Sequence, residues 1–213
     1  MKSEHKEMMK ARRRNIKLTL SYDGTNYHGF QRQTKVVAVQ NVLEGALFKL
    51  FGDSIELAAA GRTDAGVHAI GQVVNFFTDG TIPIQNVVRA GNRLLPDDIV
   101  LLKAEEADRD FSALHSVKSK IYIYKVFENE LADPFMSRFY WHVNKKLNLE
   151  DMQEALKYIE GEHDFLHFVL LAEMIQALFV KSMKLVVQKK IMYILLNFGA
   201  VDFYIIWLEI SWV

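Results

Sequence analysis

Residues 55–77 have the sequence IELAAAGRTDAGVHAIGQVVNFF, in which two strand-like segments flank a polar loop. The flanking segments, Ile55 to Ala60 and Gln72 to Phe77, are rich in apolar residues and are short enough to be strands. Gly61 and Gly66 permit tight backbone turns between them. The stretch therefore predicts two strands joined by a compact loop that carries ionisable side chains.

The loop contains residues that can perform chemistry. Asp64 follows Arg62 by two positions, and a neighbouring guanidinium favours the carboxylate form and lowers its pKa. Such a carboxylate can act as a nucleophile, a base or an electrostatic stabiliser, although an ordinary Arg–Asp turn contact is the alternative on these residues alone. The loop lacks the Gly-Lys-Ser/Thr ending of a phosphate-binding loop. His68 has no partner at metal-ligand spacing, which favours a structural hydrogen bond over a metal site.

Outward from this loop, the chain alternates between strand and helix patterns. Strand periodicity recurs in three further segments, Ile16–Ser21, Ile99–Lys103 and Lys120–Phe127. Helical spacing recurs in three others, Val39–Phe51, Pro83–Leu94 and Leu149–Ile159, which stop at or before Gly52, Pro96 and Gly161. Because strands and helices mix without a regular βαβ repeat, the pattern predicts an α+β fold.

Composition narrows the class of protein. The 213 residues allow one large domain or two small ones, and 50% hydrophobic content supports a substantial core. The 26 basic residues balance 26 acidic ones, which excludes a polycation that binds nucleic acid by charge alone. The chain has no cysteine, so disulfides, thiolate zinc sites and cysteine nucleophiles are excluded.

The two ends of the chain differ from its body. Residues 1–15 are charged and contain a basic cluster at Lys10 and Arg12–Arg14. This pattern favours a solvated extension over an arm that binds nucleic acid.

The tail after Phe165 is strongly apolar and has no proline. Residues 191–213 have the length of a membrane span, but Asp202 and Glu209 argue against one, and we expect loose packing with a helix over residues 170–196.

Several collinear motifs resemble one known family. The motif GRTDAGVHA at 61–69 is similar to the signature of the TruA family of tRNA pseudouridine synthases. The other motifs of the family have counterparts at Tyr22–Thr25 with Gly29–Gln33, at Asn92–Ile99, at Lys118–Tyr124 and at Gly161–Phe165. The resemblance covers about 150 residues, from Ile16 to Phe165, and several ordered motifs make it specific.

This resemblance implies a fold and a division into domains. The fold would be that of pseudouridine synthases, an α+β fold with a mixed, mainly antiparallel sheet flanked by helices. Residues 1–15 would be a basic extension, 16–110 the amino-terminal domain with the catalytic loop, and 111–165 the start of a second, incomplete domain. Residues 166–213 would be an anomalous apolar tail.

The resemblance also implies a function. The enzymes isomerise uridine to pseudouridine in the tRNA anticodon stem-loop, at positions 38 to 40. Asp64 matches the catalytic aspartate, and we assign Tyr122, Arg62 and His68 to substrate binding. Tyr122 and Tyr124 share a face of their strand by period two. The reaction needs neither cofactor nor metal. The expected partners are tRNA and a second copy of the chain, in the cytoplasm and away from membranes.

The sequence departs from the family pattern at two places. Leu114 stands where the family usually has arginine before an aromatic residue.

Beyond Phe165, the resemblance stops. If the codons of residues 197–213 are regrouped by one base, every step permits the string FRGSGFLYNMVRNIVG, which resembles the family's carboxy-terminal active-site motif, and residues 166–168 permit TSF. We therefore hypothesise that the chain is read out of frame after Phe165. The alternative to an active enzyme is an inactive RNA-binding or misfolded remnant.

Overall fold

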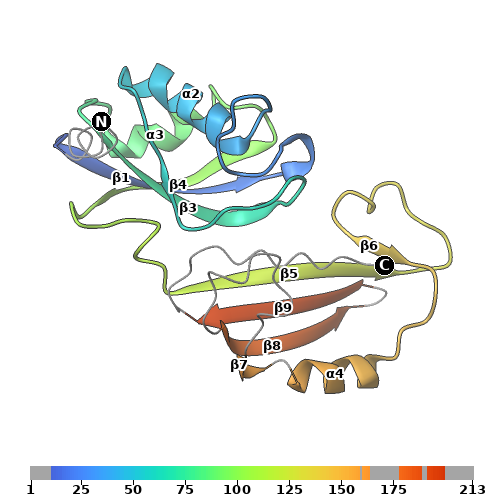
Figure 1. The fold of residues 1–213 in the computed structure, drawn as a ribbon. Helices are drawn as coiled ribbons and strands as arrows, with labels where there is room; N and C mark the ends of the chain where they lie inside the picture. Colours follow the sequence, from blue (N-terminus) through green and yellow to red (C-terminus); the bar gives the residue numbers. More distant parts are fainter. Residues whose placement is uncertain (1–10, 159, 164–177, 189–190, 200–213) are drawn as a thin grey trace. The chain divides into compact units, whose positions relative to one another are not determined.

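A computed structural model describes residues 11–158, 160–163, 178–188 and 191–199. The chain divides into two compact units, Met1–Val117 and Lys118–Val213, and each contains one sheet (Figure 1). Nearly all strand pairs in the two sheets are antiparallel. Three α-helices accompany the sheets in the described part of the chain. The predicted α+β class is confirmed.

The first sheet has the strand order β2-β3-β1-β4. Strand β1 (Arg14–Tyr22) lies in the middle, between β3 (Ala69–Thr78) and β4 (Ile99–Ala107), while β2 (Ala58–Ala59) pairs with the outer side of β3. The alternation predicted for β1 is confirmed, because Ile16, Leu18 and Leu20 are completely buried. Burial of such side chains stabilises the fold by about 1.5–3 kcal/mol each.

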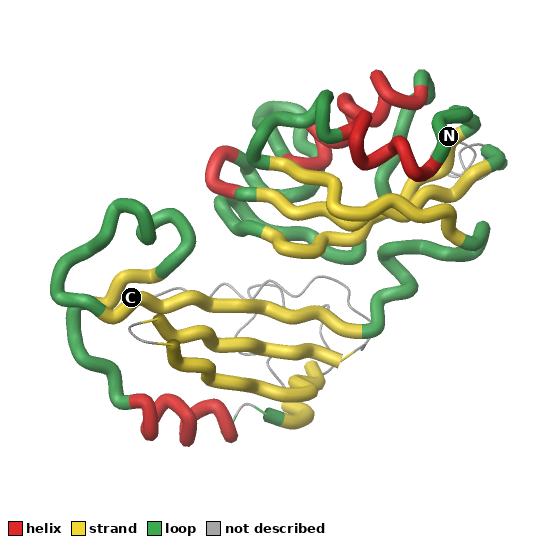
Figure 2. The backbone as a smooth tube through the Cα atoms, turned by 180° about the vertical axis from the view of Figure 1, so that it is seen from behind, coloured by secondary structure: helices red, strands yellow, loops and turns green. Residues whose placement is uncertain are grey.

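Helices α2 (Val39–Phe51) and α3 (Ile84–Gly91) lie on the same face of this sheet (Figure 2). As predicted, α2 ends at Gly52, whose φ of 76° is left-handed and whose N–H donates to the carbonyl of Phe48. Helix α3 ends three residues earlier than the pattern predicted, because the Asn92 side chain bonds both backbone groups of Leu101 on β4. The core between the helices and the sheet is formed by Leu43, Leu47, Val74, Phe76, Val87 and the inward residues of β1 and β4.

The second unit contains a sheet of order β6-β5-β9-β8-β7. Its strands are β5 (Ser119–Glu128), β6 (Trp141–Val143), β7 (Gly161–His163), β8 (Leu178–Gln188) and β9 (Ile191–Gly199), with β6 parallel to β5. Helix α4 (Leu149–Lys157) begins at Asn148, whose side chain accepts from the N–H groups of Glu150 and Asp151. A small cluster around Val126 and Val143 packs against Leu147, Leu149 and Met152.

The helix predicted over residues 170–196 is wrong over residues 178–188 and 191–196, and residues 170–177 and 189–190 lie outside the described part of the chain. Residues 178–188 and 191–199 instead form the antiparallel strands β8 and β9, and β9 pairs with β5 from Ser119 to Phe127. Together the two strands are rich in valine, isoleucine and aromatic residues, which favour strands. The pairing of β9 with β5 joins segments far apart in the sequence, so a local pattern does not reveal it. Among the described residues, no helix is both long enough and apolar enough to cross a membrane.

The segment after β4 remains attached to the first sheet. The Asn15 amide donates to the carbonyls of Asp108 and Phe111 at 2.7 and 2.9 Å, and the Asn75 side chain accepts from Ala113 N–H at 2.7 Å. The two asparagines are 2% exposed and bond each other at 2.8 Å, so neither amide is buried without a partner. The first unit therefore continues to Val117, past the boundary that we predicted after Asp110.

Replacing Asp53 by asparagine is expected to lower stability more at neutral pH than at pH 3. Asp53 accepts from the Thr78 hydroxyl at 2.5 Å and from Asp79 N–H at 2.8 Å, and these bonds, led by Thr78, hold the pKa of Asp53 below its ordinary value of 3.8. A lowered folded-state pKa stabilises the fold above about pH 4, and this stabilisation is lost as the pH falls through the folded-state pKa.

Urea unfolding of the wild type and Asp53→Asn at pH 7 and pH 3 measures this effect. The gap between their midpoints should narrow at the lower pH, and an unchanged gap would contradict the linkage. Asp110→Asn, on an exposed side chain, is the control for the loss of a carboxylate and should leave the pH 7 midpoint close to that of the wild type.

Candidate active site

The candidate site is built on the loop between β2 and β3, which carries Arg62, Asp64 and His68. Its first part is fastened to β3: Ala60 N–H donates to the carbonyl of Val73 at 2.9 Å, and the Gln72 side-chain amide donates to the carbonyl of Gly61. Strand β3 is paired on both sides within the first sheet. The loop therefore leaves a rigid element, as a site that must hold its geometry requires.

A second segment, residues 22–30, runs alongside the loop and clamps its backbone. Phe30 N–H donates to the carbonyl of Thr63 at 2.9 Å, and Gly66 N–H donates to the carbonyl of Tyr27 at 3.1 Å. Between these two bonds, His28 and Ala65 form an isolated antiparallel bridge. We call residues 22–30 the clamp segment, because their backbone holds the loop on both sides of Asp64.

Two glycines allow the clamp segment to approach the loop this closely. Gly29 has a φ of +83°, and a Cβ there would lie 2.5 Å from the carbonyl oxygen of Thr63. A Cβ on Gly24 would lie 2.0 Å from the carbonyl oxygen of Val67. Real Cβ atoms do not occupy such positions, so these residues must be glycine for the two backbones to touch.

Tyr22 connects the end of β1 to the loop through its side chain. Its hydroxyl lies 2.7 Å from Oγ1 of Thr63, the residue directly before Asp64. Tyr22 is 3% exposed, and its ring packs beside Phe30 with centroids 6.1 Å apart. Burial is the main cause that raises the pKa of Tyr22 to about 12, and the Thr63 bond acts in the opposite direction, so the hydroxyl is neutral at physiological pH.

His68 closes the other end of the loop, and the structural hydrogen bond expected from the sequence is present. Its Nδ1 atom accepts from Gly24 N–H at 3.0 Å, and the same nitrogen lies 3.0 Å from Oδ1 of Asp23. An unprotonated Nδ1 accepts from Gly24, whereas a protonated Nδ1 donates to Asp23. In either state, His68 is bound to the start of the clamp segment.

The two other predicted loop residues occupy different environments. Arg62 is exposed, whereas Asp64 is half-buried and its carbonyl accepts from Val67 N–H at 3.1 Å. That bond closes a turn at Gly66, whose φ is +78°. The Asp64 side chain therefore lies at the start of a fixed turn, in a position where a carboxylate can serve as nucleophile or base. The predicted ion pair between Arg62 and Asp64 stays a prediction.

Tyr122 lies on β5 in the second unit, which is described separately from the loop. The predicted alternation on this strand is confirmed, because Tyr122 and Tyr124 are half-buried while Ile121 and Ile123 are exposed. Burial raises the pKa of Tyr124 and lowers the pKa of Lys120 on the same face. Leu114, the departure from the family pattern, is 47% exposed.

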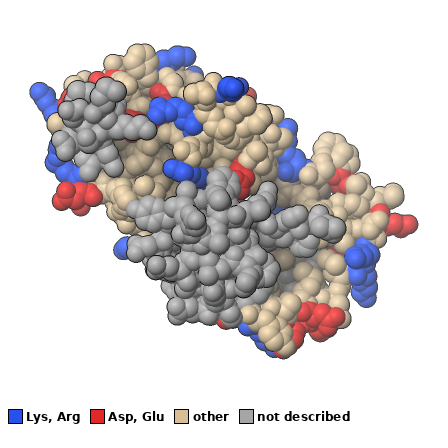
Figure 3. All heavy atoms as spheres, in the orientation of Figure 1, with Lys and Arg blue, Asp and Glu red and all other residues tan. Residues whose placement is uncertain are grey.

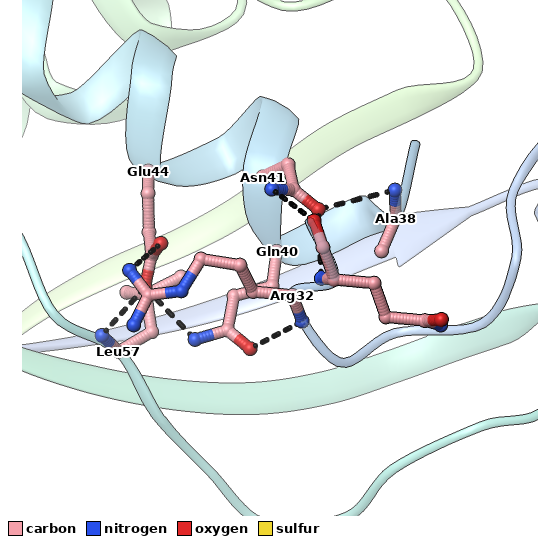
Figure 4. Close-up of polar contacts among 7 residues, drawn as sticks. Arg32, Ala38, Gln40, Asn41, Glu44 and Leu57 are labelled. Carbon is pink, nitrogen blue, oxygen red and sulfur yellow. Dashed lines mark hydrogen bonds and ion pairs between the residues drawn. The ribbon is translucent and has the colours of Figure 1, made fainter. Parts of the chain in front are cut away.

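A polar network fixes the chain that follows the clamp segment (Figure 4). The carboxylate of Glu44 on α2 accepts from the Arg32 guanidinium at 2.9 Å, from the Gln40 amide at 2.8 Å and from Leu57 N–H at 3.2 Å. The Gln40 side chain in turn accepts from Arg32 N–H at 2.9 Å. Sequence reasoning missed this network, because Arg32 and Leu57 lie outside helix α2 and are 12 and 13 positions from Glu44.

Replacing Glu44 by leucine is expected to destabilise the first unit by about 2 kcal/mol. Glu44 is 8% exposed, and leucine would leave the buried Leu57 N–H without its acceptor, which costs about 1–3 kcal/mol. Thermal unfolding measures the loss. Lys49→Leu, on the same helix and exposed, is the control; equal melting temperatures for the two variants would show that the network does not stabilise the unit.

The described part of the basic cluster, Arg12–Arg14, is engaged in the fold, and Lys10 lies outside the described residues. Arg12 donates to the carbonyls of Ser54 and Phe77, and Arg14 donates to the carbonyls of Gly80 and Ile82 and to Glu106. On the face drawn in Figure 3, the described basic and acidic side chains are interspersed and do not gather into one basic patch. Arg12 and Arg14 therefore belong to the framework of the first unit, and neither the solvated extension nor the nucleic-acid arm describes them.

Comparison with known proteins gives this site a context. Residues 19–114 match the sequence profile of a family described as tRNA pseudouridine synthase. Curated relatives named tRNA pseudouridine synthase A include those of Acetivibrio thermocellus, 44% identical over 155 residues, and Oceanobacillus iheyensis, 47% identical over 154 residues. These alignments cover 73% and 72% of this chain but 64% and 61% of the relatives. The chain thus spans less than two thirds of the length of the relatives that it matches, and the aligned length agrees with the resemblance predicted for Ile16–Phe165.

Proposed function

We propose that this chain, whose matched part belongs to the tRNA pseudouridine synthase family, isomerises uridine to pseudouridine in tRNA. The observation that carries the proposal is the clamped loop: the segment with Asp64 is held by hydrogen bonds from Tyr22, Phe30 and Gly24. A rigidly held carboxylate is what covalent catalysis on a nucleotide requires. The proposed target is the anticodon stem-loop, at positions 38 to 40.

The proposed reaction breaks one bond and forms another without any redox change. The glycosidic C1′–N1 bond of uridine breaks, the uracil ring rotates, and a C1′–C5 bond forms. The C5 proton leaves to solvent and N1 gains a proton, so the product is an isomer of the substrate. Asp64 forms a transient covalent bond, either to C1′ as the C1′–N1 bond breaks or to C6 of the uracil ring before it breaks, and this bond to Asp64 is broken again before the product leaves.

The other predicted residues would prepare the substrate. The target uridine must leave its stack, which costs a few kcal/mol, and aromatic and cationic side chains offset that cost. Tyr122 would pack against the extruded base and assist removal of the C5 proton. Arg62 and His68, on the same loop as Asp64, would bind the substrate next to the carboxylate. We further propose that the chain acts as a homodimer in the cytoplasm.

A second candidate function is favoured by the end of the resemblance. The relatives align over 154–156 residues of this chain, and residues 166–213 are the part that a one-base frame shift would explain. If the chain is read out of frame there, it lacks the family's carboxy-terminal motif and would be an inactive RNA-binding remnant. Sequencing the gene tests the frame hypothesis, since codons incompatible with FRGSGFLYNMVRNIVG would reject it.

Release of tritium from tRNA labelled at C5 of uridine separates the two functions. Turnover by the purified full chain supports the enzyme, and mapping of the modified positions tests the anticodon assignment. Binding of tRNA in a filter assay without tritium release supports the remnant. If the chain shows no tRNA binding and no tritium release, both candidate functions are overturned.

A further inference from the structure

We propose that Tyr22 is a positioning residue for Asp64, acting through the hydroxyl of Thr63. This inference rests on the proposed function for its catalytic consequence, but the structural part stands on the geometry of the first unit alone. It assigns a role to a residue that lies outside the loop and is separated from Thr63 by 41 positions in the sequence.

The support for Tyr22 comes from its pairing within the sheet. Tyr22 is the last residue of β1, the strand that is paired on both sides, and it pairs with Ala69 of β3 and Ile99 of β4. Its ring is buried beside Phe30 of the clamp segment. A phenol ring has few rotatable bonds, so its hydroxyl is a fixed point from which to hold a neighbour.

Thr63 links the Tyr22 hydroxyl to Asp64, the next residue in the chain. Its carbonyl accepts from Phe30 N–H and its hydroxyl bonds Tyr22, so backbone and side chain are held at the same time. After Asp64, the bond from Val67 N–H and the bridge at Ala65 fix the other side. The Tyr22–Thr63 bond therefore completes the restraint on the residue that precedes Asp64, and its loss would let the carboxylate shift. A displacement of about 1 Å can reduce the rate about a hundredfold.

The test compares hydroxyl deletions inside and outside the loop. Tyr22→Phe and Thr63→Val each remove the bond, while Thr63→Ser keeps it. Thr78→Val is the matched control, because Thr78 is completely buried and its hydroxyl bonds Asp53 elsewhere on β3. Hydrogen–deuterium exchange of peptides that cover residues 59–70 is the first readout, and kcat and KM for tRNA are the second.

We expect Tyr22→Phe and Thr63→Val to speed exchange in the loop by about tenfold, with Thr63→Ser close to the wild type and Thr78→Val unchanged in these peptides. In turnover, kcat should fall about ten- to a hundredfold with KM altered less than twofold. Equal exchange in all variants, or loop exchange that rises as much in Thr78→Val, would overturn the inference. If the wild type shows no turnover, the proposed function fails while the exchange result still decides the positioning role.

Discussion

Asp64→Asn is expected to reduce pseudouridine formation at least about a thousandfold while leaving the fold intact. Asparagine has nearly the shape of aspartate, but its neutral amide cannot form the covalent adduct with the nucleotide. The loop should keep its conformation, because it is held by backbone bonds from Phe30 and Gly66 and by the Tyr22–Thr63 contact. Tritium release under single-turnover conditions measures the rate, and hydrogen exchange of residues 59–70 verifies the loop.

Asp110→Asn is the control for this substitution. Asp110 is exposed, lies in the same unit and undergoes the same chemical change, so its variant should release tritium at the wild-type rate. Binding of tRNA should be the same in both variants, since binding energy comes from many contacts with the phosphate backbone. If Asp64→Asn retained wild-type turnover, the loop would not be the catalytic element, and the proposed assignment of Asp64 would fail.

Local patterns were sufficient to predict the elements that contain their own signals. Helix α2 could be predicted because its apolar spacing and its terminal glycine at position 52 are both in the sequence. Strand β1 could be predicted because Ile16, Leu18 and Leu20 alternate with polar residues and face one core. In both cases only one face is buried, so the spacing of the apolar residues along the sequence indicates whether the segment is a helix or a strand.

The tail shows where such patterns fail. Residues 178–199 are strongly apolar, which alone does not separate a helix from a strand, and β9 pairs with β5 from Phe127 back to Ser119, a partner about 70 positions away. Strand β9 is stabilised by β8 within this segment and by β5 outside it, and the pairing with β5 is not visible in the segment itself. The prediction was wrong because the pairing is long-range.

The candidate site was predicted only in part, because local motifs do not show which distant segments lie beside them. The loop residues Arg62, Asp64 and His68 lie within one motif, and the motif placed them together. The clamp segment was identified as a separate motif at Tyr22–Thr25, but nothing in either motif shows that their backbones touch. The available signal was Gly24, a glycine that no helix end or strand requires and that therefore indicates close approach of another backbone.

Gly24→Ala is expected to destabilise the first unit by about 3 kcal/mol and to disorder the loop. Its Cβ would lie 2.0 Å from the carbonyl oxygen and 2.5 Å from the carbonyl carbon of Val67, and both are backbone atoms that cannot rotate away. Overpacking of a closed contact costs about 1–3 kcal/mol, and here the shift would also break the bond from Gly24 N–H to His68. Urea unfolding and exchange of residues 59–70 measure the two effects.

Two control variants, Gly45→Ala and Gly66→Ala, add the same methyl group at positions where it meets no other atom within 4 Å. A Cβ on Gly45, exposed in helix α2, meets no atom within 4 Å, so Gly45→Ala should stabilise the helix by about 0.8–1 kcal/mol. Gly66 also has open space but a φ of +78°, so Gly66→Ala should cost about 1–2 kcal/mol from backbone strain alone. The same chemical change thus has three expected outcomes, and only a larger loss at Gly24 than at Gly66 supports direct contact between the clamp segment and the loop. Equal losses would mean that the backbones at Gly24 and Val67 are not in contact, and the positioning of Asp64 would then require another explanation.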